Sequence, residues 1–160
     1  MNRYRLAAGL ALAVLGLLAL AGPVAAGKQV PFKGRLEGEV TVTPLAPPFL
    51  RVDVEAGGKA TRLGKFTLDI PHVVDPTTRT AVGSYEFTAA NGDKVYADFT
   101  GQASLTATPG VIAIVETATI TGGTGRFAGA TGSFTVERLY DRIAGTTIGS
   151  FQGTISAPSP

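Results

Sequence analysis

The chain has 160 residues, with no cysteine, no tryptophan and one histidine, His72. The missing cysteines exclude disulfides, thiol nucleophiles and zinc sites built from cysteine. A single histidine excludes a histidine-rich metal site and weakens the case for a histidine-dependent catalytic triad. We therefore expect neither a metal nor a cofactor in this protein.

The first 26 residues have the pattern of a secretory signal peptide. Arg3 and Arg5 precede an apolar run over 6–21, and small residues follow as far as Ala26. The run of about 16 residues is shorter than the roughly 20 that a membrane-spanning helix needs. We predict cleavage after Ala26 and export to the periplasm or the extracellular space. The alternative is that the segment is retained as an N-terminal anchor.

Removal of the first 26 residues leaves 134, enough for one domain that is held together by its own core. The signal contains two of the 14 basic residues, so 12 basic residues remain against 12 acidic ones. A chain without net charge has no general attraction for nucleic acids or anionic membranes. We expect neither as a partner after the signal is removed.

The mature chain alternates between polar and apolar residues and contains no segment with a helical period. Over 32–43, every even-numbered residue is apolar or glycine and every odd-numbered residue is polar, which predicts a strand with one dry face. We expect breaks at Gly57-Gly58, between Pro71 and Pro76, and at the Asn91-Gly92-Asp93 turn. The pattern predicts eight strands, over 32–43, 50–56, 62–70, 80–90, 95–105, 111–120, 133–141 and 146–156.

Eight strands with mostly short connections indicate an all-β fold, either an antiparallel barrel or a sandwich. The segment 111–120 is apolar on both faces, with Val111, Ala113 and Val115 on one of them. Such a strand is expected to be covered on both sides. In a small barrel the outer cover would come from a loop or from another subunit, so a homo-oligomer is one expectation.

The stretch 119–134 is the most specific signal in the chain. It holds five glycines, which permit positive φ angles and close backbone approach, and it predicts a long connection between two strands. Phe127 within it should plug the barrel end or pack on a neighbouring strand. The spacing Gly123-x-Gly125-x-x-Ala128 formally fits a dinucleotide fingerprint. That fingerprint needs a helix next, and a strand pattern follows instead, so we expect no nucleotide site.

The glycine pattern over 122–132, together with 83–87 and 91–93, resembles the allene oxide cyclase and dirigent superfamily. It is similar in particular to small exported bacterial members without an assigned activity. The resemblance implies an eight-stranded antiparallel calycin-like β-barrel after the signal peptide, and commonly a trimer. We accordingly divide the chain into a signal peptide (1–26), a barrel domain (27–156) and a C-terminal tail (157–160). No residue matches a catalytic motif of the plant enzymes, so no catalytic residue is assigned.

Glu116 is the side chain with the strongest chemical interest. Its face is otherwise isoleucine and alanine, and a buried carboxylate needs a partner or a raised pKa. It is either an acid or acceptor inside a cavity, or a group that reaches solvent or pairs with Arg126 or Arg138. His72, beside Pro71 at a predicted strand end, is expected to be a surface residue. The candidate ligand-cavity residues are Glu116, Phe87, Phe99, Phe134 and Arg126.

The sequence favours a non-enzymatic role, either the binding of a small apolar molecule in the barrel or a structural function. One alternative is an enzyme of the allene oxide cyclase or dirigent type, which would confine a reactive apolar intermediate in the cavity. Another is an oligomeric assembly module. A barrel completely filled by Phe87, Phe99 and Phe134 would count against both ligand binding and cavity catalysis.

Overall fold

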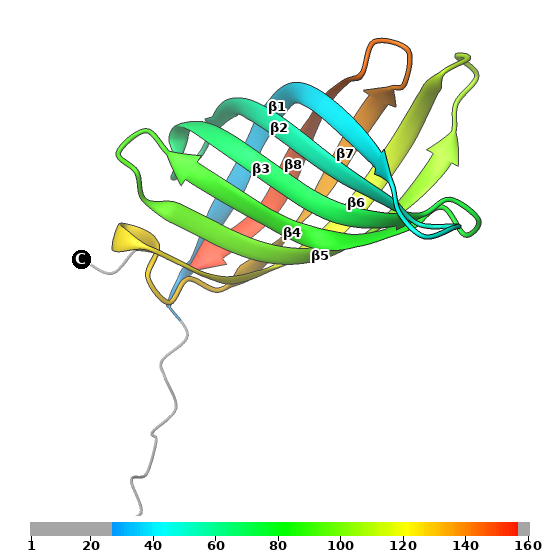
Figure 1. Ribbon diagram of the computed structural model, residues 1–160. Helices are drawn as coiled ribbons and strands as arrows, with labels where there is room; N and C mark the ends of the chain where they lie inside the picture. The colour runs from blue at the N-terminus through cyan, green and yellow to red at the C-terminus, as the bar shows by residue number, and fades with distance from the viewer. Residues whose placement is uncertain (1–26, 157–160) are drawn as a thin grey trace, which may run out of the picture.

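A computed structural model of the protein describes residues 27–156, which form a closed barrel of eight antiparallel strands (Figure 1). Each strand pairs with the next one along the chain, and the last pairs with the first. The predicted all-β, eight-stranded antiparallel barrel is confirmed. The strands are β1 (Gln29–Pro44), β2 (Leu50–Ala60), β3 (Gly64–Asp75), β4 (Thr80–Ala89), β5 (Lys94–Leu105), β6 (Val111–Gly123), β7 (Gly132–Asp141) and β8 (Thr146–Ser156).

The predicted signal peptide (1–26) and the predicted tail (157–160) lie outside the described residues. Within 27–156, no helix is long and apolar enough to cross a membrane.

The break expected at Gly57-Gly58 does not occur, because β2 continues to Ala60. Gly58 lies opposite Phe66 of β3, and a methyl group in its place would clash with the Arg35 carbonyl oxygen of β1 and come 3.1 Å from the ring of Phe66. The glycine therefore allows the close approach of the β1 backbone and of the ring instead of turning the chain. The turn lies between β2 and β3, where Arg62 has a φ of 70°.

The loop expected between Pro71 and Pro76 is also wrong, because β3 continues to Asp75. The alternation of Phe66, Leu68 and Ile70 carries on through His72, which is buried. Proline lacks a backbone N–H and is tolerated where a strand ladder is interrupted. The paired residues of β3 and β4 indeed skip from Asp69 to His72, so the proline sits in that gap.

The glycine stretch connects β6 to β7, as predicted, and contains one short 3-10 turn, η1 (Gly125–Phe127). Phe127 is buried, and η1 packs against the ends of β5 and β6. The η1 turn lies at the same end of the barrel as the β4–β5 hairpin (Figure 1). Gly125 has a φ of 55°, a left-handed conformation that glycine adopts without steric cost. Phe127 thus packs on the ends of the neighbouring strands, which is one of its two expected placements.

Aromatic rings fill the half of the barrel next to η1. The ring of Phe87 is at the centre of the group, with its centroid 5.4 Å from those of Phe66 and Phe151. Most neighbouring rings meet edge to face or tilted, the arrangement that aromatic quadrupoles favour. The cluster comprises Phe32, Phe66, Tyr85, Phe87, Phe99, Phe134 and Phe151, all buried.

Glycines on the inner face allow these rings to fit. Gly34 is paired with Phe151 and Gly153 with Phe134, so each ring lies across from a residue without a side chain. A methyl group on Gly34 would come 2.9 Å from the ring of Phe151. A small barrel can be filled completely by side chains of complementary size, and this half is packed in that way.

In the opposite half the inward side chains are less buried. Along β5 the inward positions change from Phe99, which is buried, through Ala103, which is half-buried, to Leu105, which is 69% exposed. The same change runs along β1, where Leu36 is buried and Val42 is 41% exposed. The barrel is therefore packed at the η1 end and open to water at the end that holds the β1–β2, β3–β4, β5–β6 and β7–β8 loops.

Truncation of Phe87 should be costly because five other aromatic rings lose their common neighbour. We expect Phe87→Ala to lower the free energy of unfolding by about 3–5 kcal/mol, measured by urea denaturation. Val82→Ala is the matched control on the same strand, since Val82 points outward and is 58% exposed. Its cost should stay below about 1 kcal/mol. Equal losses in the two variants would show that the aromatic group is not the core.

Candidate functional site

A buried ion pair lies at the boundary between the two halves. Glu116 of β6 is completely buried, and the side chain of Arg138 on β7 is 2% exposed. The guanidinium donates two hydrogen bonds to the carboxylate, from Nη2 to Oε1 at 2.7 Å and from Nε to Oε2 at 3.0 Å. This bidentate arrangement is the strongest form of an arginine–carboxylate contact.

Two further side chains complete the hydrogen bonding of the pair. The Tyr85 hydroxyl donates to Oε2 of Glu116, and Thr147 of β8 accepts from Nη1 of Arg138 at 3.5 Å. Thr147 in turn donates to the carbonyl of Leu139 at 2.8 Å. Among the described residues, no buried side-chain nitrogen or oxygen lacks a partner. A buried charged network is tolerated when every polar atom in it has a hydrogen-bond partner.

The surroundings of Tyr85 and Arg138 fix the protonation state of each side chain. Burial and the adjacent Glu116 carboxylate raise the pKa of Tyr85 well above its usual value, so the hydroxyl stays protonated and remains a donor. Burial alone would lower the pKa of Arg138, but the hydrogen bonds and charge of Glu116 raise it above the ordinary arginine value. Arg138 is therefore a permanent cation.

Glycines also stand opposite the polar side chains of the inner face. Gly101 of β5 is paired with Glu116, and a methyl group on it would lie 2.9 Å from the Glu116 Cγ. Gly149 of β8 is paired with Arg138, and Gly83 of β4 with His72. The missing side chains of these glycines thus leave space for Glu116, Arg138 and His72.

His72 lies on the inner face of β3, one step toward the open end. Its ring packs against Phe99 with the centroids 5.6 Å apart, and Nδ1 is 2.9 Å from the Ile70 carbonyl oxygen. Burial lowers the pKa of His72 below its usual value, and the nearby Arg138 cation adds to this effect. The imidazole is therefore neutral near pH 7.

Apolar side chains continue the inner wall from this polar level to the open end. Most inward residues beyond His72 and Glu116 are partly buried or exposed, so the wall there is accessible to water; Thr147, which is buried, is an exception. These residues are Val40, Val42, Val74, Ala81, Ala103, Leu105, Ile112, Ile114 and Tyr140. A mostly apolar concave surface with a few polar groups at its base is the usual form of a small-molecule site.

Four of the five candidate cavity residues, Glu116, Phe87, Phe99 and Phe134, lie on the inner face and are buried. Phe87 and Phe134 belong to the packed aromatic cluster and therefore do not line the open half. Arg126 lies apart from them, on η1. It donates to the Arg62 carbonyl oxygen at 3.0 Å, and its Nε is 3.7 Å from Asp93.

Of the other residues at the polar level, Arg138 is one of the two partners that the sequence suggests for Glu116, and it is the partner observed. Tyr85 has no polar role predicted from the sequence. His72, expected on the surface, is buried. The alternation of Phe134, Val136 and Arg138 on β7 is the signal that points Arg138 inward. The same alternation through Pro71 would have placed His72 inside.

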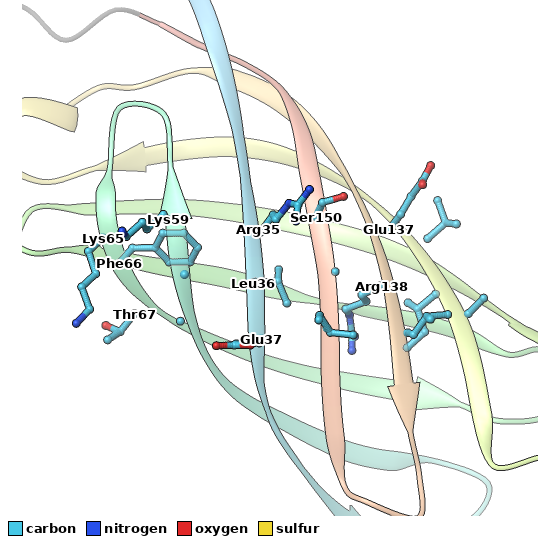
Figure 2. A pocket seen from close by; sticks show the side chains of 18 residues that line it. Arg35, Leu36, Glu37, Lys59, Lys65, Phe66, Thr67, Glu137, Arg138 and Ser150 are labelled. Carbon is cyan, nitrogen blue, oxygen red and sulfur yellow. The ribbon is translucent and has the colours of Figure 1, made fainter.

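A separate groove of about 1170 Å³ lies on the outer surface of the barrel (Figure 2). At one end, Ala113, Leu139 and Ile148 are cross-strand neighbours in register and form an apolar row over β6, β7 and β8. Leu139 and Ile148 are 47% and 60% exposed. Val115 of β6 is 48% exposed, so within 27–156 no loop covers it as expected. Charged residues of both signs line the rest of the groove, namely Arg35, Glu37, Lys59, Lys65 and Glu137.

Within residues 27–156, no three histidine, cysteine, aspartate or glutamate side chains are grouped in a way that could hold a metal ion. The carboxylate of Glu116 is already bound by Arg138 and Tyr85.

Glu116→Gln removes the negative charge and leaves Arg138 as a buried cation without a counterion. Breaking a buried pair in this way costs about 3–5 kcal/mol. We expect a loss of this size in the free energy of unfolding at pH 7.5, measured by chemical denaturation. Glu137→Gln is the matched control, because Glu137 is exposed on the neighbouring strand and should change stability by less than about 0.5 kcal/mol. Unchanged or increased stability of Glu116→Gln would mean that the carboxylate is a strained group instead.

The barrel is similar in fold to the solved structure of the pterocarpan synthase dirigent protein GePTS1. The TM-score is 0.57, over 82% of this chain and 92% of that chain, at 11% sequence identity. No family profile matches the sequence, and no curated protein matches it. Similarity at this identity establishes a shared fold and leaves activity open. The chain thus has the same barrel fold as that dirigent protein. Its membership of the allene oxide cyclase and dirigent superfamily, and of an exported bacterial branch within it, stays a prediction.

Proposed function

We propose that this protein is exported and binds a small apolar molecule inside the open end of its barrel. The observation that carries the proposal is the change in burial along the inner face, from buried rings to partly exposed apolar side chains. Apolar side chains that point inward yet remain accessible to water gain free energy when an apolar ligand covers them. The open end provides such a surface on nearly every strand.

The packed half supports this function by remaining fixed. Phe99 and Tyr85, with ring centroids 4.8 Å apart, close the base of the open half together with Glu116 and Arg138. Because these side chains are buried and hydrogen-bonded or packed, the base has one shape before a ligand arrives. A preformed site loses less conformational entropy on binding than one that must be ordered.

An enzymatic role is the second candidate, and the polar level favours it. A permanent cation, a buried carboxylate and a neutral imidazole lie next to an apolar chamber, which suits the confinement of a reactive intermediate. The dirigent protein with this fold is a pterocarpan synthase, so a barrel of this type can take part in synthesis. We place binding first because Glu116, Arg138 and Tyr85 are engaged with one another and fully or nearly fully buried.

The binding proposal predicts that a neutral apolar fluorophore, N-phenyl-1-naphthylamine, enters the barrel and becomes brighter. Ala103→Trp should weaken its binding at least about tenfold, because Ala103 points into the open half and the indole would fill it. Ser104→Trp is the matched control, since Ser104 is exposed on the outer face of the same strand. Fluorescence titration measures both. Equal affinity in the two variants, or no binding by the unmodified protein, would contradict the proposal.

The outer groove favours self-association as a further property of the protein. Its apolar row is uncovered in a single chain, and the groove carries both basic and acidic side chains. A surface with both signs of charge can be complementary to a copy of itself around a symmetry axis. We therefore propose a homo-oligomer, with a trimer as the form that the resemblance implies.

Self-association predicts that the protein sediments as a species heavier than one chain at micromolar concentration. Leu139→Asp should return it to a monomer, because a charge would be buried in the apolar row. Thr117→Asp, on the outer face of the neighbouring strand and outside the groove, is the control and should leave the assembly intact. A monomeric unmodified protein at high concentration would rule out this proposal.

A further inference from the structure

We infer that His72 selects the ligand: among apolar molecules that enter the open end, it favours those that present a hydrogen-bond donor, a hydroxyl or an N–H, to its Nε2 atom. The inference rests on the proposed binding function and names the chemical class of ligand for that site.

The hydrogen bond of the histidine ring fixes which nitrogen carries the proton. A carbonyl oxygen can only accept, so the 2.9 Å contact between Nδ1 and the Ile70 oxygen requires that Nδ1 is the donor. In a neutral imidazole the other nitrogen then has a free lone pair. Nε2 of His72 is therefore a hydrogen-bond acceptor.

This acceptor is in contact with solvent, although the residue as a whole is buried. Nε2 has no hydrogen-bond partner among residues 27–156, and no side-chain nitrogen or oxygen there is both buried and without a partner. Nε2 must therefore lie against space that water can enter. Because the ring is on the inner face and packs on Phe99, that space is the interior at the level of the open half.

The other polar groups at this level do not compete for the same role. Both oxygens of Glu116 already accept hydrogen bonds, and the residue is completely buried. Tyr140 is half-buried near the open end, but a phenol hydroxyl both donates and accepts and so does not discriminate. His72 is the group that distinguishes a donor from an acceptor on the ligand.

Protonation of His72 would reverse this preference, because Nε2 would then become a donor. The charged groups that act on the ring are Asp53 of β2, Glu116 of β6 and Arg138 of β7. Tyr85 of β4 is uncharged, and Phe99 of β5 and Gly83 of β4 carry no charge. Burial is the largest effect and favours the neutral ring, so the acceptor state holds near pH 7 and is lost as the solution becomes acidic.

The test compares two rigid molecules of nearly the same shape, borneol, which has a hydroxyl, and camphor, which has only a carbonyl. Each is titrated by calorimetry into the protein purified without a histidine tag. At pH 7.5 we expect borneol to bind about tenfold more tightly, because camphor would leave Nε2 without a partner. At pH 5 the ratio of the affinity for borneol to the affinity for camphor should fall. His72→Phe should bring this ratio close to one at both pH values. Val73→Ala, a change at an outward-pointing neighbour, should leave the ratio unchanged.

Nitrogen-15 NMR of the unmodified protein gives a second readout that needs no variant, since the chain has one histidine. We expect Nδ1 protonated and Nε2 unprotonated at pH 7.5, with the Nε2 resonance shifted by borneol and not by camphor. A proton on Nε2, or a ratio that His72→Phe preserves, would overturn the role of His72. Equal binding of the two molecules would do the same and leave the binding function standing. Failure of both to bind would contradict that function as well.

Discussion

The bidentate contact between Glu116 and Arg138 is the interaction on which the rest of this structure depends. Placing two charges inside a barrel is costly unless each is paired and fully hydrogen-bonded. Tyr85 and Thr147 provide the remaining contacts, and glycines on β5 and β8 leave the space that the two long side chains need. The pair ties β6 to β7 in the middle of the interior, where burial changes from complete to partial.

Stability and function are divided between the two halves that meet at this level. On the η1 side, seven buried aromatic rings pack together and Phe127 is buried beside them, so this half provides much of the hydrophobic stabilisation. On the other side, the strands continue with apolar inward side chains that nothing in the described chain covers. Because the packed half already holds the barrel closed, the open half can leave its apolar wall exposed for a ligand without losing the fold.

The fold was largely predictable from sequence because strand alternation and turn residues are local signals. The same signals failed where the role of a residue depends on a neighbouring strand. Gly58 faces Phe66 of β3 rather than turning the chain, and Pro71 lies in a gap in the pairing of β3 with β4. The choice of Arg138 over Arg126 as the partner of Glu116 depends on the β6–β7 register, which local patterns do not specify. How tightly the interior is packed depends on barrel size relative to side-chain volume, so only the structure could show how burial falls along the inner face.

The division of the interior is tested most directly by a crystal structure of the protein under xenon pressure, since xenon occupies apolar space that lacks side chains. The account predicts xenon in contact with Val74, Ala103 and Ile112 in the open half and none beside Phe87. Xenon among the aromatic rings, or an interior with no xenon at all, would contradict a barrel that is packed on one side of Glu116 and open on the other.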